Sequence, residues 1–241
     1  MTARGVILTR PMGYNSEFMR RITDAGYHGV ERPLLTIEEV EQDENSKARV
    51  INLDHYDVVV FVSRNAVRYG MPHLTGRWPQ WPERLRWCAV GAQTADELHR
   101  YDVNVIYPEN EGAEGLLSTM DWQDADKVLI VRGKGGLTAL RDGLEAQSIT
   151  VDYLEVYERV GNPHVTLHQE VIDLRLDVVV LTSGEGVDPL CASIAADVLS
   201  EMTIVVPSER VKEMLVEKGL HNILVSGSTS DEAMLTTLAS I

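Results

Sequence analysis

Short apolar runs alternate with stretches of helical periodicity along the whole chain. Several of the runs, such as residues 58–62, contain no polar position at all. An unbroken apolar run of this length is typical of a strand covered on both faces, and therefore of a parallel sheet flanked by helices. The pattern predicts strands at residues 5–9, 29–35, 57–62, 87–90, 103–106, 127–131, 149–157, 177–182, 203–206 and 222–225.

The same order of elements occurs twice. The segment DVVVFVSRNAV at residues 57–67 is matched 120 residues later by DVVVLTSGEGV at 177–187. Arg10, which follows the first predicted strand, is likewise matched 122 residues later by Arg132. Loop insertions account for a drift of this size in the offset. The predicted fold class is therefore α/β, with two similar doubly wound parallel-sheet domains.

One segment does not fit a simple tandem pair. Residues 148–160 are long for a strand in a small sheet, and their apolar phase slips between Tyr153 and Leu154. A strand that serves first one environment and then another has such a pattern. The corresponding segment of the first half carries Pro33. Both segments are predicted to cross between the domains.

Length, composition and charge narrow the class of function. A chain of 241 residues fits two small domains, and its 44% hydrophobic content is ordinary for a globular protein. No apolar run is long enough to span a membrane, and the N-terminus lacks the apolar stretch of a signal peptide, so a cytoplasmic protein without a membrane partner is expected. Cys88 and Cys191 are then expected to be free thiols. A formal net charge of −15, with no run of Lys and Arg to offset it, argues against nucleic acid as a partner.

Candidate chemistry lies at the ends of the predicted strands. Ligands of open parallel sheets bind beyond the carboxyl ends of the strands, where helix N-termini present unpaired N–H groups. Here these positions hold hydroxyls, glycines and arginines without a cluster of carboxylate, His or Cys side chains, and such a set suits an anionic ligand. The positions are Thr9 and Arg10, then 63–65, 91–94, 132–136, 182–184 and 207–209.

Structural interpretations remain open at the same positions. Ser63, Ser183 and Ser208 each precede a predicted helix, so they could be simple N-caps. Arg10 and Arg132 could form surface salt bridges instead of binding an anion.

Three further sequence features are interpreted mainly as structural. RGKGG at residues 132–136 lacks the glycine spacing of nucleotide-binding loops. His164 and His168 are one helical turn apart, but no third ligand is near them in the sequence, so no metal site is predicted. RWPQWP at residues 77–82 is predicted to be a surface loop stiffened by proline, with a role as a lid as the alternative.

Seven segments, in order over nearly the whole chain, resemble the uroporphyrinogen-III synthase family. They are TRP at 9–11, FVSRNAV at 61–67, AVGAQTADEL at 89–98, EGAEGLL at 111–117, LIVRGKGG at 129–136, VYERV at 156–160 and LTSGEGV at 181–187. The resemblance implies two α/β domains joined by a two-stranded ribbon, with the first domain discontinuous. The implied bounds are 1–34 with 160–241 for the first domain, 38–155 for the second, and 35–37 with 156–159 for the ribbon.

The resemblance also implies a reaction. The family closes the linear tetrapyrrole hydroxymethylbilane to uroporphyrinogen III, with loss of water and inversion of the last ring, and uses no cofactor or metal. A monomer is expected, with the duplicated units as facing walls of one cleft. A non-enzymatic two-domain α/β protein that binds an anionic small molecule, or a two-domain glycosyltransferase, would share the architecture.

Site residues follow from the resemblance and from the strand ends together. Thr94 and Tyr157 match hydroxyl positions that the family links to catalysis, and Tyr157 is predicted to assist departure of the hydroxyl. Val62 replaces the usual Thr of its motif, and the turn around Ser208 departs from the family pattern. The residues predicted to bind substrate are Arg10, Ser63, Asn65, Gly91, Arg132, Gly133, Ser183 and Ser208.

Overall fold

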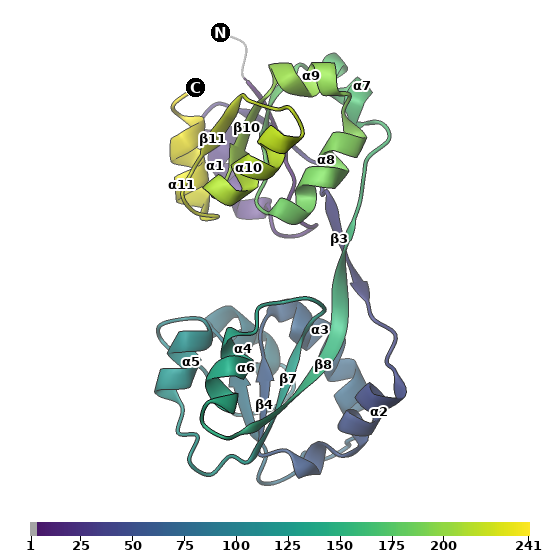
Figure 1. The fold of residues 1–241 in the computed structure, drawn as a ribbon, viewed down its shortest axis with the longest axis vertical. Coiled ribbons are helices and arrows are strands. Elements are labelled where there is room, and N and C mark those ends of the chain that lie inside the picture. The colour runs from purple at the N-terminus through teal and green to yellow at the C-terminus, as the bar shows by residue number, and fades with distance from the viewer. Residues whose placement is uncertain (1–3) are drawn as a thin grey trace. The chain divides into compact units, whose positions relative to one another are not determined.

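The computed structural model describes residues 4–241, which form two compact units (Figure 1). Unit 1 consists of the chain up to Ile37 together with Val160–Ile241, and unit 2 is Glu38–Arg159. The predicted class is confirmed, because each unit is a mainly parallel sheet with helices on both faces and the first unit is discontinuous in sequence.

Unit 2 is built on a six-stranded sheet in the order β3-β8-β7-β4-β5-β6. The strands are β3 (Leu35–Glu39), β4 (Val58–Phe61), β5 (Arg86–Ala89), β6 (Val105–Ile106), β7 (Lys127–Gly133) and β8 (Thr150–Gly161). From β8 to β6 all neighbours are parallel. The helices are α2 (Glu44–Ile51), a 3₁₀ turn (Leu53–His55), α3 (Arg64–Thr75), α4 (Ala92–His99), α5 (Ala113–Thr119) and α6 (Ala139–Glu145).

Both faces of this sheet are buried, as the unbroken apolar runs predict. Val58 and Val60 of β4 pack in one core cluster with residues of α5 and α6. On β7, Val131 lies against Gly70 of α3, where an added Cβ would come within 2.6 Å of the valine. The close approach of α3 to the sheet therefore depends on the missing side chain at Gly70.

Unit 1 is built on a five-stranded parallel sheet in the order β11-β10-β9-β1-β2. The strands are β1 (Gly5–Leu8), β2 (His28–Glu31), β9 (Leu176–Val180), β10 (Thr203–Val206) and β11 (Ile223–Val225). The helices are α1 (Ser16–Asp24), α7 (Leu167–Leu174), a 3₁₀ turn (Gly184–Gly186), α8 (Val187–Ser193), α9 (Ala196–Glu201), α10 (Glu209–Glu217) and α11 (Asp231–Leu238). Ile7 of β1 faces the cluster under α7 to α10, while Val6 and Leu8 face Phe18 and Ile22 of α1.

The two sequence repeats do not coincide with the two structural units. Unit 1 combines the first two strands of the first repeat with the last three of the second, and unit 2 combines the complementary set. The order β2-β1-β9-β10-β11 therefore corresponds strand for strand to β8-β7-β4-β5-β6. The two repeats have exchanged their first pairs of strands.

The predicted single strand at 29–35 is wrong, because the run forms two strands separated at Pro33. Strand β2 ends at Glu31 in the sheet of unit 1, whereas β3 begins at Leu35 and pairs with β8. The carbonyl of Pro33 accepts hydrogen bonds from Asn162 Nδ2 at 2.9 Å and pairs with His164 Nε2 at 2.8 Å. Proline has no N–H to continue a ladder, so the chain changes sheets at this point.

Strands β3 and β8 form the ribbon, and each runs from one unit into the other (Figure 1). Its hydrogen bonds join Asn162 N to Leu34 O at 2.8 Å and Val40 N to Val156 O at 3.1 Å, so the two strands are antiparallel. Strand β8 also changes register against β7, where Arg132 pairs with Glu155 but the next residue pairs with Tyr157. The buried positions of β8 change from Val151 to Leu154 before this bulge, at the apolar phase slip, and the bulge sets Tyr157 opposite Gly133.

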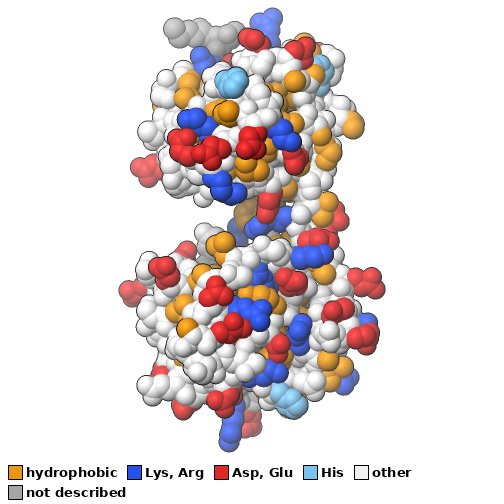
Figure 2. Space-filling view, in the orientation of Figure 1, with side chains coloured by type: hydrophobic (Ala, Val, Ile, Leu, Met, Phe, Trp, Pro, Cys, Tyr) orange, Lys and Arg blue, Asp and Glu red, His pale blue; other side chains and the backbone are white. Residues whose placement is uncertain are grey.

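Charged side chains of both signs are interspersed over the visible faces of the two units (Figure 2). Among the described residues, no helix has the length and apolar character that a membrane crossing needs.

Candidate active site

The hydroxyls of Tyr157 and Ser63 meet at the carboxyl edge of the unit 2 sheet. Ser63 follows β4 and is the N-cap of α3, where its Oγ accepts a hydrogen bond from Ala66 N–H at 3.0 Å. Tyr157 comes from β8, and its hydroxyl lies 3.1 Å from Ser63 Oγ. Either hydroxyl can donate in this second bond. Two residues that are 94 positions apart are thus joined by the parallel arrangement of β4, β7 and β8.

The ring of Tyr157 is tightly enclosed and only 4% exposed. Gly133 is its partner in register on β7, and a Cβ at that glycine would lie 2.5 Å from Tyr157 Cζ and 3.0 Å from its hydroxyl oxygen. Lys134 N–H donates to the carbonyl of Tyr157 at 2.8 Å, and the ring of Tyr69 is 6.0 Å away between centroids. Gly133 therefore serves the site by making room for the phenol.

A pocket of about 430 Å³ opens beside Ser63. Ser63, Gly91, Thr94 and Glu111 are among the residues that line it. Thr94 is buried in the first turn of α4, with 6% of its surface exposed. The structure therefore brings three predicted site residues to one pocket.

Glu111 occupies the N-terminus of α4 and was not predicted from the sequence. Its Oε1 accepts a hydrogen bond from Ala92 N–H at 2.9 Å, and a Cβ at Gly91 would lie 2.7 Å from its carboxyl carbon. A carboxylate is favourable at this place because the helix dipole and the unpaired N–H groups attract negative charge. The only signal in the sequence is its place at the start of the EGAEGLL segment.

The two predicted arginines are engaged within their own units. Arg132 is buried at the end of β7, and it donates from Nε to Gly133 O at 3.0 Å and from Nη1 to Leu137 O at 3.2 Å. Its guanidinium lies 4.3 Å from the ring centroid of Tyr153. Arg132 thus holds the loop after β7, and its contact with a substrate stays a prediction.

Arg10 lies in unit 1, where it forms an ion pair with Asp231 and donates to Thr229 O at 2.7 Å. Of the two interpretations of Arg10, the structure therefore shows the salt bridge. Its contact with an anionic substrate stays a prediction.

The remaining predicted serines follow parallel strands of unit 1. Ser183 comes after β9 and Ser208 after β10, and both have the extended backbone of an N-cap. Neither makes a side-chain cap hydrogen bond, in contrast to Ser63. Their hydroxyls are thus not engaged as helix caps, whereas the N-cap interpretation is confirmed for Ser63. Asn65 lies in the first turn of α3, next to Ser63.

The two histidines and the two cysteines considered in the sequence have structural surroundings. His164 pairs with the carbonyl of Pro33, and His168 Nδ1 accepts from Ala195 N–H at 3.3 Å. Within residues 4–241, no group of three or more His, Cys, Asp or Glu side chains could hold a metal ion. Cys88 and Cys191 are free thiols, as expected, and burial raises the pKa of Cys88 to about 12.

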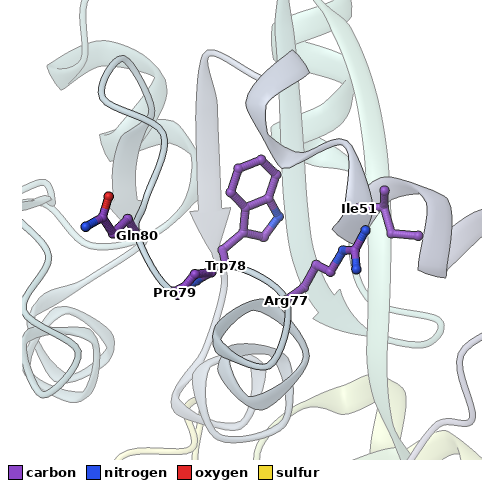
Figure 3. A pocket seen from close by; sticks show the side chains of 5 residues that line it. All are labelled: Ile51, Arg77, Trp78, Pro79 and Gln80. Atoms are coloured by element: carbon purple, nitrogen blue, oxygen red, sulfur yellow. The ribbon is translucent and has the colours of Figure 1, made fainter.

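The loop at residues 77–82 borders a pocket of about 560 Å³ (Figure 3). Figure 3 shows Trp78 and Arg77 from this loop with Ile51 from the end of α2. The indole Nε1 donates to Val50 O at 2.7 Å. Because the loop follows α3, which is about 18 Å long, it lies near the opposite edge of the unit 2 sheet from Ser63. Within unit 2, the loop is therefore a packing element and is not placed to cover Ser63.

Comparison with known proteins gives a consistent result. The family model "Uroporphyrinogen-III synthase HemD" matches residues 16–236. The uroporphyrinogen-III synthase of Proteus mirabilis is 30% identical over 165 residues, which cover 67% of this chain and 83% of the relative. That of Escherichia coli K12 is 27% identical over 244 residues, which cover 97% and 99%.

Solved structures show the same fold. The uroporphyrinogen-III synthetase of Helicobacter pylori matches with a TM-score of 0.62 at 19% identity over 98% of this chain and 99% of that one. A mutant uroporphyrinogen III synthase of Thermus thermophilus matches with a TM-score of 0.59 at 15% identity over 99% and 98%. With the family model matched over nearly the whole length, the chain belongs to the uroporphyrinogen-III synthase family, whose members are enzymes of haem biosynthesis.

Proposed function

We propose that this protein converts hydroxymethylbilane to uroporphyrinogen III as a cofactor-independent hydro-lyase. The observation that carries the proposal, beside family membership, is the Tyr157 and Ser63 hydroxyl pair at the carboxyl edge of a parallel sheet. A positioned phenol in that place is suited to give a proton to a departing hydroxyl. The protein is proposed to act as a monomer on this tetrapyrrole substrate.

The substrate's acetate and propionate groups are proposed to bind at helix N-termini. In unit 2 these are the starts of α3 and α4, near Ser63, Asn65 and Gly91. A carboxylate that binds Ala92 N–H has to displace Glu111, which holds that position in the structure. Each charge-assisted hydrogen bond contributes about 1.5 to 3 kcal/mol, so a few such contacts can hold the ligand despite the net charge of the chain.

Catalysis is proposed to begin at Tyr157. Its proton passes to the terminal hydroxyl, which leaves as water and produces an azafulvene. The substituted carbon of ring D then attacks, and a spiro-pyrrolenine intermediate fragments and recloses to the inverted ring. Thr94 is proposed to position the substrate in the neighbouring pocket.

The test is to supply hydroxymethylbilane and resolve the product isomers. Spontaneous closure is expected to yield the uninverted type I compound, so the protein should shift the product to type III in the presence of a chelator and without nucleotide. An unchanged isomer ratio at high protein concentration would remove the enzyme and leave the non-enzymatic anion-binding protein.

A further inference from the structure

Ser63 Oγ lies between two hydrogen-bond partners. It accepts a hydrogen bond from Ala66 N–H at 3.0 Å and lies 3.1 Å from the hydroxyl of Tyr157. If Tyr157 donates to Ser63, the phenol proton is turned away from any substrate. If Ser63 donates to Tyr157, the phenol proton is left to point outward, toward a ligand.

We propose that Ser63 is a positioning residue that donates its proton to the Tyr157 oxygen and stabilises the phenolate left after proton transfer. This role differs from substrate binding, and it rests on the proposed function. When Ser63 is the donor, its hydroxyl orients the phenol before proton transfer and stabilises the negative charge of Tyr157 afterwards.

The N-terminus of α3 supports this direction. The Ala66 N–H bond withdraws electron density from Ser63 Oγ and makes its O–H a stronger donor. The first turn of α3 contains Arg64 and no acidic residue. The positive charge at this end of the helix dipole is therefore not neutralised by a carboxylate of the same turn. Negative charge on Tyr157 is therefore developed next to a favourable dipole, and Ser63 transmits the effect.

The packing around Tyr157 makes this hydrogen bond necessary. The phenol is 4% exposed and its ring is confined by Gly133 and Tyr69, so water has little access to replace Ser63. A buried charge without a hydrogen-bond partner is strongly disfavoured. Loss of the serine hydroxyl should consequently act on the charged form of Tyr157 and spare substrate affinity.

The step balances without another reactant. The C–O bond of the hydroxymethyl group breaks with its electron pair on oxygen, which takes the Tyr157 proton and leaves as water. The pyrrole nitrogen lone pair forms the new double bond and the nitrogen keeps its proton, so the azafulvene forms as a cation while Tyr157 becomes a phenolate bound by Ser63. After reclosure, ring D loses a proton and becomes aromatic again, and this proton returns to Tyr157.

The experiment measures initial rates of type III formation against substrate concentration for full-length Ser63→Ala and Ser63→Gly. Both variants should lower kcat by about 10- to 100-fold with little change in KM, as expected for one hydrogen bond to a charged group. Ser63→Thr should restore most of the rate.

Two comparisons separate this role from others. In a Tyr157→Phe background, Ser63→Ala should lower kcat no further, since its effect passes through the phenol. Ser230→Ala is the matched control for loss of a helix cap, because Ser230 Oγ accepts from Ala233 N–H at 3.3 Å in α11. This control should lower the melting temperature without lowering kcat. Ser63→Gly guards against a folding defect, because glycine is tolerated at N-caps.

Each other outcome overturns the inference. A change confined to KM would make Ser63 a substrate ligand only, and additive losses with Tyr157→Phe would show that the two hydroxyls act independently. If the wild-type protein forms no type III product, the proposed function itself fails, which is a different result from any of these.

Discussion

The phenol of Tyr157 is held by contacts that leave it little freedom. Gly133 lies under its ring and Ser63 meets its hydroxyl, while the backbone of Lys134 bonds to its carbonyl. Removal of the oxygen alone therefore leaves the ring packed as before. Ser63 keeps its bond to Ala66 in such a variant, so the α3 cap also survives.

Tyr157→Phe is accordingly expected to slow turnover by about 10²- to 10⁴-fold, the usual contribution of a positioned proton donor, with little loss of thermal stability. Thr94→Ala should have a smaller effect on kcat if that hydroxyl only positions the substrate. Turnover and melting temperature should be measured on the same preparations. Full activity of a stably folded Tyr157→Phe protein would refute the catalytic assignment.

At the scale of elements, β8 is anchored to its neighbours through Asp152. The carboxylate accepts a hydrogen bond from Tyr56 Oη at 2.9 Å and pairs with Lys127 Nζ of β7 at 3.2 Å and with Arg49 of α2 at 3.6 Å. Burial acts to raise the pKa of Asp152, but the hydrogen bonds from Tyr56 and Lys127 outweigh it and lower the pKa. The ionised carboxylate is thus favoured by the folded state.

This anchor predicts a pH-dependent difference in stability. Because the folded pKa lies below the unfolded value of about 3.9, Asp152 stabilises the fold at neutral pH and loses that effect as pH falls through the folded pKa. Asp152→Asn should lower the melting temperature at pH 7, and the gap to the wild type should close toward pH 2. Asp124→Asn, at an exposed position of the same unit, is the control. Melting curves that remain equally separated at all pH values would contradict the role of the charge.

The whole molecule is organised by the exchange of strands between the two repeats. Apart from the ribbon strand β3, each sheet takes two neighbouring strands from one repeat and three from the other, and each core cluster is formed by residues that pack on one of these sheets. A fragment that contains one whole structural unit should therefore hold a complete core. A fragment that contains one sequence repeat should not.

Residues 38–159, expressed alone, are expected to unfold in one cooperative thermal transition, because β4 to β8 and their helices are all present. The fragment 1–122 has the same length but separates β1 from β9 and β4 from β7, so it is expected to show no cooperative transition. Circular dichroism during heating and amide dispersion in NMR spectra distinguish the two. A cooperative fold for 1–122 would mean that the repeat, and not the exchanged pair, is the folding unit.

The sequence by itself determined the α/β class, most strand positions and the strand ends where the hydroxyls lie. Burial on both faces of a sheet requires apolar side chains at every position, so runs such as residues 58–62 report their environment locally. Resemblance added Thr94 and Tyr157. In the run at 29–35, Pro33 indicated a crossing between the domains, but the sequence did not show where one strand ends and the next begins.

Only the tertiary structure decided which segments meet. The contact of Tyr157 with Ser63, the carboxylate of Glu111 on Ala92 N–H and the inward turn of Arg132 depend on chain distance, register and a β-bulge. Strand β1 has β2 of its own repeat on one side, but its partner on the other side is β9 of the second repeat and not β4 of its own, although β4 is equally apolar. Apolarity is a property of each residue, but partner choice is a property of the whole chain, because it is settled by which arrangement buries both sheets and satisfies their hydrogen bonds at once.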